Sequence, residues 1–153
     1  MKHFLLLIVL LSVGSLMAYG QQSKLSGGKS PVSNDANPTS KSSPAYAEVL
    51  LKKTELQADL ESLLVEYTED YPKIKEIRFM LELIQKESER LTSVKPSDTS
   101  KLTLALGKLI VRKVELETDM WGLQRNYKDE HPDVKRAKRK VDIYEAAIKE
   151  ILG

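Results

Sequence analysis

The feature that most constrains the fold of this chain is an internal repeat with an offset of 60 residues. Residues 46–91 align with residues 106–151 without a gap, and most apolar positions match in kind. The identical pairs are Lys53/Lys113, Glu55/Glu115, Leu56/Leu116, Asp59/Asp119, Leu63/Leu123, Tyr67/Tyr127, Pro72/Pro132 and Lys75/Lys135. A repeat of this kind is typical of tandem structural units that bury their apolar faces against each other.

Within each copy, apolar residues recur at alternating steps of three and four, which indicates helices with a seam close to a 3.5-residue period. Pro72 and Pro132 interrupt the two copies at the same place. Proline lacks an amide proton and disfavours helix at the residue before it, so each is well placed as the first residue of a new helix. The short connection then favours a second helix that folds back antiparallel to the first.

The sequence therefore predicts an all-α fold of two tandem antiparallel helical hairpins, in a coiled-coil-like, up-down-up-down four-helix arrangement. Residues 44–92 form the first hairpin and residues 101–152 the second, and Ser43-Pro44 is typical of a helix start. In antiparallel register, Leu56 lies opposite Ile84 and Val49 opposite Leu91. Both proline corners are expected at one end of the bundle.

The N-terminus reads MKHFLLLIVLLSVGSLMAYGQQ, which predicts a secretory signal peptide over residues 1–20 with cleavage after Gly20. An uncleaved anchor is the alternative, but the apolar run of about 15 residues is shorter than the ~20 that span a bilayer. Residues 21–43, rich in Ser, Gly, Asn and Pro, predict a disordered linker. We therefore expect a periplasmic or secreted protein with no transmembrane span after cleavage.

Composition argues against several function classes. Cysteine is absent, and 24 basic against 22 acidic residues leave a formal charge of +2, which does not favour a nucleic-acid binder. Neither HExxH nor GxSxG occurs, and His131 is the one histidine left after signal cleavage. We expect no catalytic residues, no metal site and no cofactor.

A basic run near the second corner has two interpretations. It comprises Lys135, Arg136, Lys138, Arg139 and Lys140. These residues fill the positions outside the seam, so a solvated helix surface is one interpretation. The other is contact with an anionic glycan or a lipid headgroup on the exported side.

Three polar residues of the repeat are predicted to have structural roles. Lys53 and Lys113 interrupt the seam at equivalent positions, where a polar residue sets register. Lys53 is expected level with Ser88, near Glu87, and Lys113 is expected to extend its ammonium group outward. His131 has Tyr71 as its counterpart, which favours a packing and hydrogen-bonding role at the corner.

Apolar residues beside the seams leave two alternatives open. They include Leu50, Leu64, Ile110, Val114 and Trp121. In the first alternative they pack the first helices of the two hairpins together. In the second they form an interaction surface centred on Trp121, which a homodimer would also use.

The corner sequences EYTEDYPKIKEI and NYKDEHPDVKRA resemble the periplasmic coiled-coil hairpins of bacterial polysaccharide chain-length-determinant proteins, the polysaccharide co-polymerases. There the turn runs through a Tyr, a few polar residues, His-Pro and an aliphatic residue, which maps here to Tyr127, His131-Pro132 and Val134. The resemblance covers the two hairpins and implies a hairpin fold in an envelope compartment. The flanking transmembrane helices, the α/β region and the kinase of that family have no counterpart, and no functional residue transfers.

The function expected from these observations is that of an exported, non-enzymatic coiled-coil protein of the bacterial cell envelope, with a structural or interaction role. An accessory part in surface-polysaccharide export is one form of it. A protein partner or self-association is expected. The alternatives are a small periplasmic holdase-type chaperone, which would use the apolar positions near Trp121, and a polyanion-binding protein.

Overall fold

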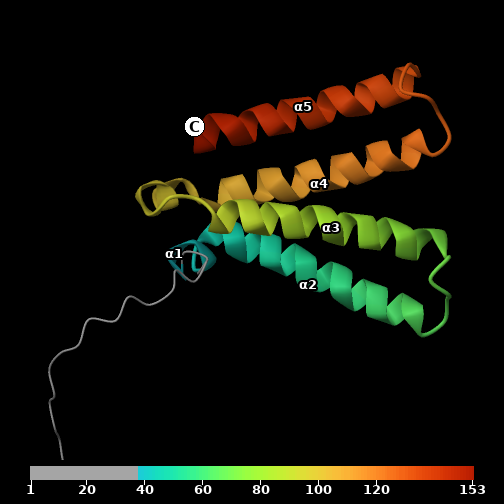
Figure 1. Cartoon of the computed structure of the whole chain (residues 1–153), viewed down its shortest axis with the longest axis horizontal. Coiled ribbons are helices and arrows are strands. Elements are labelled where there is room, and N and C mark those ends of the chain that lie inside the picture. The colour runs from blue at the N-terminus through green and yellow to red at the C-terminus, as the bar shows by residue number, and fades with distance from the viewer. Residues whose placement is uncertain (1–37) are drawn as a thin grey trace, which may run out of the picture. The chain divides into compact units, whose positions relative to one another are not determined.

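The computed structural model describes residues 38–153, so the predicted signal peptide and the linker over residues 21–37 lie outside the described residues. The described part is helical. Its elements are α1 (Pro38–Lys41), α2 (Pro44–Leu64), α3 (Pro72–Thr92), the 3₁₀ helix η1 (Pro96–Lys101), α4 (Leu104–Gln124) and α5 (Pro132–Leu152). Figure 1 shows two consecutive helical hairpins, α2–α3 and α4–α5, which confirms the predicted fold class.

Capping residues and prolines set the helix bounds. The Ser43 hydroxyl accepts a hydrogen bond from the Tyr46 amide at 3.2 Å, and Pro44 follows as the first helical residue. Thr103 caps α4 in the same way, accepting from the Leu106 amide at 3.3 Å. Pro72 and Pro132 begin α3 and α5, as predicted. Each of the four long helices has 21 residues and is therefore about 30 Å long.

The two corners have the same internal packing. The rings of Tyr67 and Tyr71 stack with their centroids 4.2 Å apart, and those of Tyr127 and His131 stack at the same distance. Nδ1 of His131 also accepts a hydrogen bond from the Asp133 amide at 3.2 Å, which caps the start of α5. The packing and hydrogen-bonding role predicted for His131 is confirmed.

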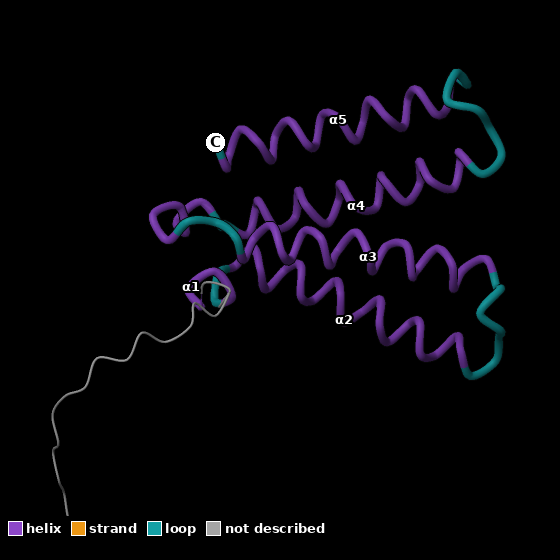
Figure 2. Tube along the Cα trace, viewed as in Figure 1, coloured by secondary structure: helices purple, strands orange, loops and turns teal. Residues whose placement is uncertain are grey.

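The seams inside the hairpins are buried as predicted. In the first hairpin, Val49 and Leu56 of α2 and Ile77, Ile84 and Leu91 of α3 are all buried. Figure 2 shows the chain reversing direction at the two proline corners, which lie at one end. The C-terminus, α1 and η1 lie at the other end, as expected for an up-down-up-down arrangement.

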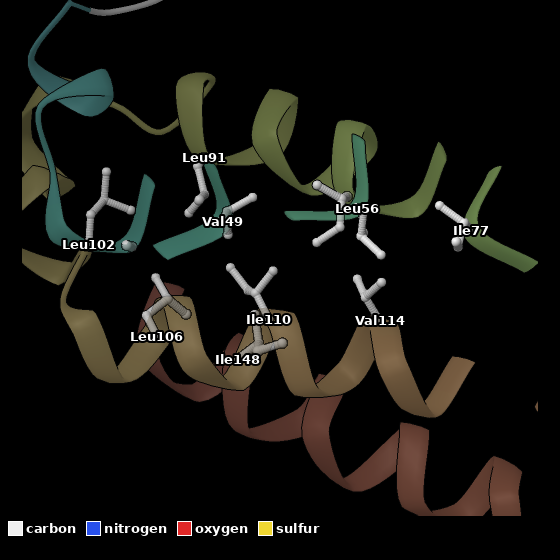
Figure 3. Packing of buried hydrophobic residues seen from close by; sticks show 11 residues of the cluster. Val49, Leu56, Ile77, Leu91, Leu102, Leu106, Ile110, Val114 and Ile148 are labelled. Atoms are coloured by element: carbon white, nitrogen blue, oxygen red, sulfur yellow. The ribbon is translucent and has the colours of Figure 1, made fainter. Parts of the chain in front are cut away.

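The two hairpins share one core. Helix α4 packs against α2 and α3 on one side and against α5 on the other. Figure 3 shows Ile110 and Val114 of α4 beside Val49 and Leu56, with Ile148 of α5 behind Ile110. The packing of the first helices against each other, one of the two alternatives, is therefore present in the structure.

The predicted linker ends earlier than expected, because its last residues fold onto the bundle. Ser40 and Ser43 are buried, and α1 packs against α3 and η1. Residues 39–41 read Thr-Ser-Lys, and so do residues 99–101 in η1. Each hairpin is therefore preceded by a short helix, and the repeat begins before the residues in which the apolar period is visible.

A glycine allows the close crossing of α2 and α4. A Cβ atom on Gly107 would lie 2.8 Å from Cβ of Glu48 and 2.9 Å from the carbonyl oxygen of Ala45. Gly107→Ala is therefore expected to lower the free energy of unfolding by about 1–3 kcal/mol, because the helices must move apart. Urea unfolding followed by circular dichroism measures this change.

Gly122 is the matched control on the same helix, because a Cβ there would meet nothing within 4 Å. Gly122→Ala is expected to raise the free energy of unfolding by about 0.5–1 kcal/mol, the helix propensity difference. Equal effects of the two substitutions would contradict the close crossing.

Candidate functional site

The residues predicted as an interaction surface are divided between the interior and the surface. Ile110 and Val114 are fully buried between the hairpins, because α4 packs against both α2 and α3. They are part of the core, which agrees with the first of the two alternatives, packing between the hairpins, and removes Ile110 and Val114 from the interaction surface of the second. Leu64 is half-buried, whereas Leu50 remains 46% exposed on α2.

Trp121 lies at the junction of the hairpins, half-buried. Its ring stacks on Phe79 of α3 with the centroids 4.9 Å apart and the planes 15° from parallel. The guanidinium carbon of Arg125 lies 5.2 Å from the centre of the indole, which is cation–π geometry. Trp121 therefore closes the corner end of the contact between the hairpins.

A groove of about 500 Å³ runs beside Trp121, between the start of α3 and the end of α4. Tyr71, Pro72, Lys73 and Glu76 line one side, and the other side is lined by Thr118, Asp119, Trp121, Gly122, Leu123 and Arg125. Glu76 and Asp119 are both in this lining, so two acidic residues face the same groove. The groove is open, and its lining pairs no nucleophile with a base.

The basic run on α5 is entirely exposed. Arg136 pairs with Asp133, whereas Lys135, Lys138, Arg139 and Lys140 form no ion pair within residues 38–153. The first hairpin differs at the equivalent positions. There Lys75 lies 2.8 Å from Asp70, and Arg78 lies 2.5 Å from Glu69. The second corner therefore presents more unneutralised positive charge than the first.

A buried ion cluster, which the seam pattern of the sequence does not predict, joins the two hairpins. Lys113 is only 7% exposed, and its ammonium group lies 2.6 Å from Glu87 of α3 and 3.0 Å from Glu145 of α5. Glu117, one turn along α4, lies 3.6 Å from the same group. The prediction that Lys113 extends outward is wrong, because carboxylates of both hairpins converge on its buried ammonium group.

Arg90 completes the cluster on the α3 side. Its Nη1 donates to Glu145 at 3.3 Å and lies 3.6 Å from Oε2 of Glu87, an oxygen that makes no hydrogen bond in the described structure. Lys53, the repeat equivalent of Lys113, lines a pocket together with Ser88, as predicted, but it donates to Gln85 at 2.8 Å, whereas Glu87 pairs with Lys113. Gln85 and Glu145 are themselves equivalent positions, so the pairing within each hairpin is repeated.

The cluster shifts the pKa values of its members. Burial alone lowers the pKa of Lys113, but the carboxylates of Glu87, Glu145 and Glu117 outweigh it and the pKa is raised. Burial raises the pKa of Glu145, but Lys113 and Arg90 outweigh it and the pKa is lowered. Burial raises the pKa of Glu117, and its interaction with Lys113 does not compensate fully.

No family model, curated protein or solved structure matches this chain. The resemblance to chain-length-determinant proteins therefore stays an expectation drawn from the two corner sequences.

Residues 38–153 contain neither a metal-ligand cluster nor a helix that could span a membrane. In that range no group of three or more His, Asp or Glu side chains is placed to hold a metal ion. No helix of the same range combines the length and the hydropathy that a bilayer span needs.

Proposed function

We propose that this chain is an exported, non-enzymatic helical protein of the bacterial cell envelope that acts by binding other proteins. Its two coiled-coil-like hairpins form the scaffold, and the outer faces of α2 and α5 form the contact surfaces. An accessory role in surface-polysaccharide export is the envelope process that the corner sequences suggest. The leader over residues 1–20 supports export.

The observation that carries this proposal is the exposure of large apolar side chains on the two outer helices. Leu50 and Leu51 are 46% and 56% exposed on α2, and Ile143 is 66% exposed on α5. Apolar side chains that gather into one contiguous exposed patch mark a contact with another protein, and Leu50 is flanked on its own face of α2 by the exposed residues Ala47 and Thr54.

Fractionation and site-specific crosslinking test the proposal. The full chain is produced in a bacterium with a photo-crosslinking amino acid at position 51, or at position 86 as an exposed control on α3. We expect a mature N-terminus at Gln21, recovery outside the cytoplasm, and a crosslinked protein band from position 51 but not from position 86. Retention of Met1 in a cytoplasmic fraction, or equal crosslinking from both positions, would contradict the proposal.

Polyanion binding is the second candidate, favoured by Lys135 and Lys138, which are exposed and form no ion pair within the part of the chain that the structure describes. It predicts binding to an acidic polysaccharide or to anionic vesicles that weakens steeply with salt. Binding that is unchanged in Lys135→Glu/Lys138→Glu would exclude this surface.

A further inference from the structure

The internal repeat allows the contact between the hairpins to be compared with the open faces of the molecule. On α4, the residues that face the first hairpin are buried: Gly107, Ile110, Val114 and Thr118. Their equivalents on α2 are all exposed: Ala47, Leu50, Thr54 and Ala58. Helix α2 therefore carries the same face as α4, but nothing in the described chain covers it.

The second hairpin has the complementary open face. On α3, Phe79 and Leu83 are partly buried, with Phe79 against Trp121 and Leu83 against the shared core. Their equivalents on α5 are Arg139 and Ile143, and both are exposed. Figure 1 shows α2 and α5 at opposite edges of the bundle, so the two open faces lie on opposite sides of the molecule.

We propose that this chain binds a second copy of itself head to tail. Within one chain, α4 packs on α2 and α3 of the first hairpin. Between copies, α2 of one chain packs in the same way on α4 and α5 of the other. The inference rests on the proposed function, since it names the partner of the same outer faces. Leu50 of the second copy takes the place of Ile110 in this arrangement. Such a contact is heterologous, so it builds open chains or rings rather than closed two-fold dimers.

The charges at equivalent positions complement each other across this contact. Lys52 of α2 lies 3.1 Å from Glu115 of α4 within the chain. The equivalent contact between copies brings Arg112 to Glu55 of the second copy. Both equivalent residues keep the sign of charge, so the same ion pair is repeated.

At two further places, the contact within the chain joins uncharged or like-charged residues, whereas the equivalent contact between copies joins residues of opposite charge. The Phe79–Trp121 stack becomes Arg139 beside Glu61 of the second copy. Glu76 and Asp119, which line the same groove, become Arg136 and Asp59 of the second copy. In the described structure Glu55, Asp59, Glu61 and Arg139 make no ion pair of their own, so these charges are free to pair between copies.

Two differences make the contact between copies weaker than the contact within the chain. Ala47 stands where Gly107 allows the close crossing, so the second copy must sit slightly farther away. Ala147 stands where Glu87 binds Lys113, so the buried ion cluster is not repeated. We therefore expect reversible association that depends on protein concentration and weakens at high salt.

Charge-reversal variants test the proposal. Each is made in the full chain and is purified with the N-terminus that it has after production in the cell. Sedimentation velocity over a concentration series is expected to show the wild type associating beyond a dimer. Asp59→Lys/Glu61→Lys and Arg136→Glu/Arg139→Glu are each expected to weaken association about tenfold or more, because attraction becomes repulsion. An equimolar mixture of the two variants is expected to recover association, since each open face again meets the opposite charge.

The matched control is Lys135→Glu/Lys138→Glu, which makes the same charge change on the same helix. Its equivalents, Lys75 and Arg78, pair within their own corner, so this variant is expected to associate as the wild type does. The proposal would be overturned if the wild type or the mixture stays monomeric. It would also be overturned if the control associates as weakly as Arg136→Glu/Arg139→Glu. Export and crosslinking from position 51 to another envelope protein would still support the proposed function in that case.

Discussion

Replacing Lys113 with methionine is expected to lower the free energy of unfolding by about 3 kcal/mol or more. The substitution removes the cation that neutralises Glu87, a residue only 6% exposed. Glu87 would keep Arg90 at 3.6 Å as its nearest cation, too far for a hydrogen bond. Urea unfolding at neutral pH and low protein concentration, followed by circular dichroism, measures the loss.

Two variants separate the loss of the ion cluster from the loss of a lysine side chain. Lys113→Met/Glu87→Met is expected to recover most of the stability, because it leaves no buried carboxylate without its cation and keeps apolar volume. Lys53→Met, at the equivalent seam position, is expected to cost about 1 kcal/mol or less, since its partner Gln85 is neutral and exposed. A Lys113→Met effect as small as that of Lys53→Met would show that the cluster does not join the hairpins.

The stability difference between the wild type and Lys113→Met is expected to depend on pH. The raised pKa of Lys113 means that its contribution is complete below the ordinary value of 10.5 and is lost as the pH rises through the folded value. The lowered pKa of Glu145 means that its contribution is present above 4.5 and is lost as the pH falls through the folded value. The raised pKa of Glu117 acts in the opposite direction, since its contribution is lost as the pH rises. The difference is therefore expected to be largest near neutral pH, and a flat profile would contradict the assignment.

Ile110→Ala is expected to lower the free energy of unfolding by about 2–5 kcal/mol. Ile110 has no exposed surface and packs in the cluster shared by both hairpins, so its truncation leaves a cavity between them. The cavity weakens the packing among α2, α3 and α4, because α4 packs against both helices of the first hairpin. The measurement is the same urea titration.

Leu50→Ala is the matched control at the equivalent position of the repeat. Because Leu50 is 46% exposed and alanine favours helix, we expect a loss below about 1 kcal/mol in the single chain. Similar losses of unfolding free energy for Leu50→Ala and Ile110→Ala would contradict the difference in burial between these two side chains.

The hairpins themselves were predictable from the sequence because their determinants are local. Pro72 and Pro132 favour a helix start through their own ring geometry, independently of distant contacts. The steps of three and four place Val49 and Leu56 on one buried stripe of α2. The helical turn at α1 was missed, because four residues are too few to show a period. Its one signal was the Thr-Ser-Lys sequence shared with η1.

The site was less predictable because it depends on how one hairpin turns against the other. A seam pattern specifies which residues meet within a hairpin, so it placed Lys53 near Glu87 and gave Lys113 no partner. The structure places Glu87 on Lys113 instead, since α3 faces α4 with that side. Trp121 illustrates the same limit, because its position on a helix does not specify Phe79 as its neighbour.

If the two hairpins fold against each other in one bundle, aromatic protons of the two hairpins lie close enough to give a nuclear Overhauser effect. The rings of Phe79 and Trp121 belong to different hairpins and lie 4.9 Å apart, so a cross-peak between them is expected. Tyr67 and Tyr71, 4.2 Å apart within one corner, supply the internal control. A cross-peak in the Tyr67–Tyr71 pair together with none between Phe79 and Trp121 would mean that the hairpins are separate in solution and do not form one bundle.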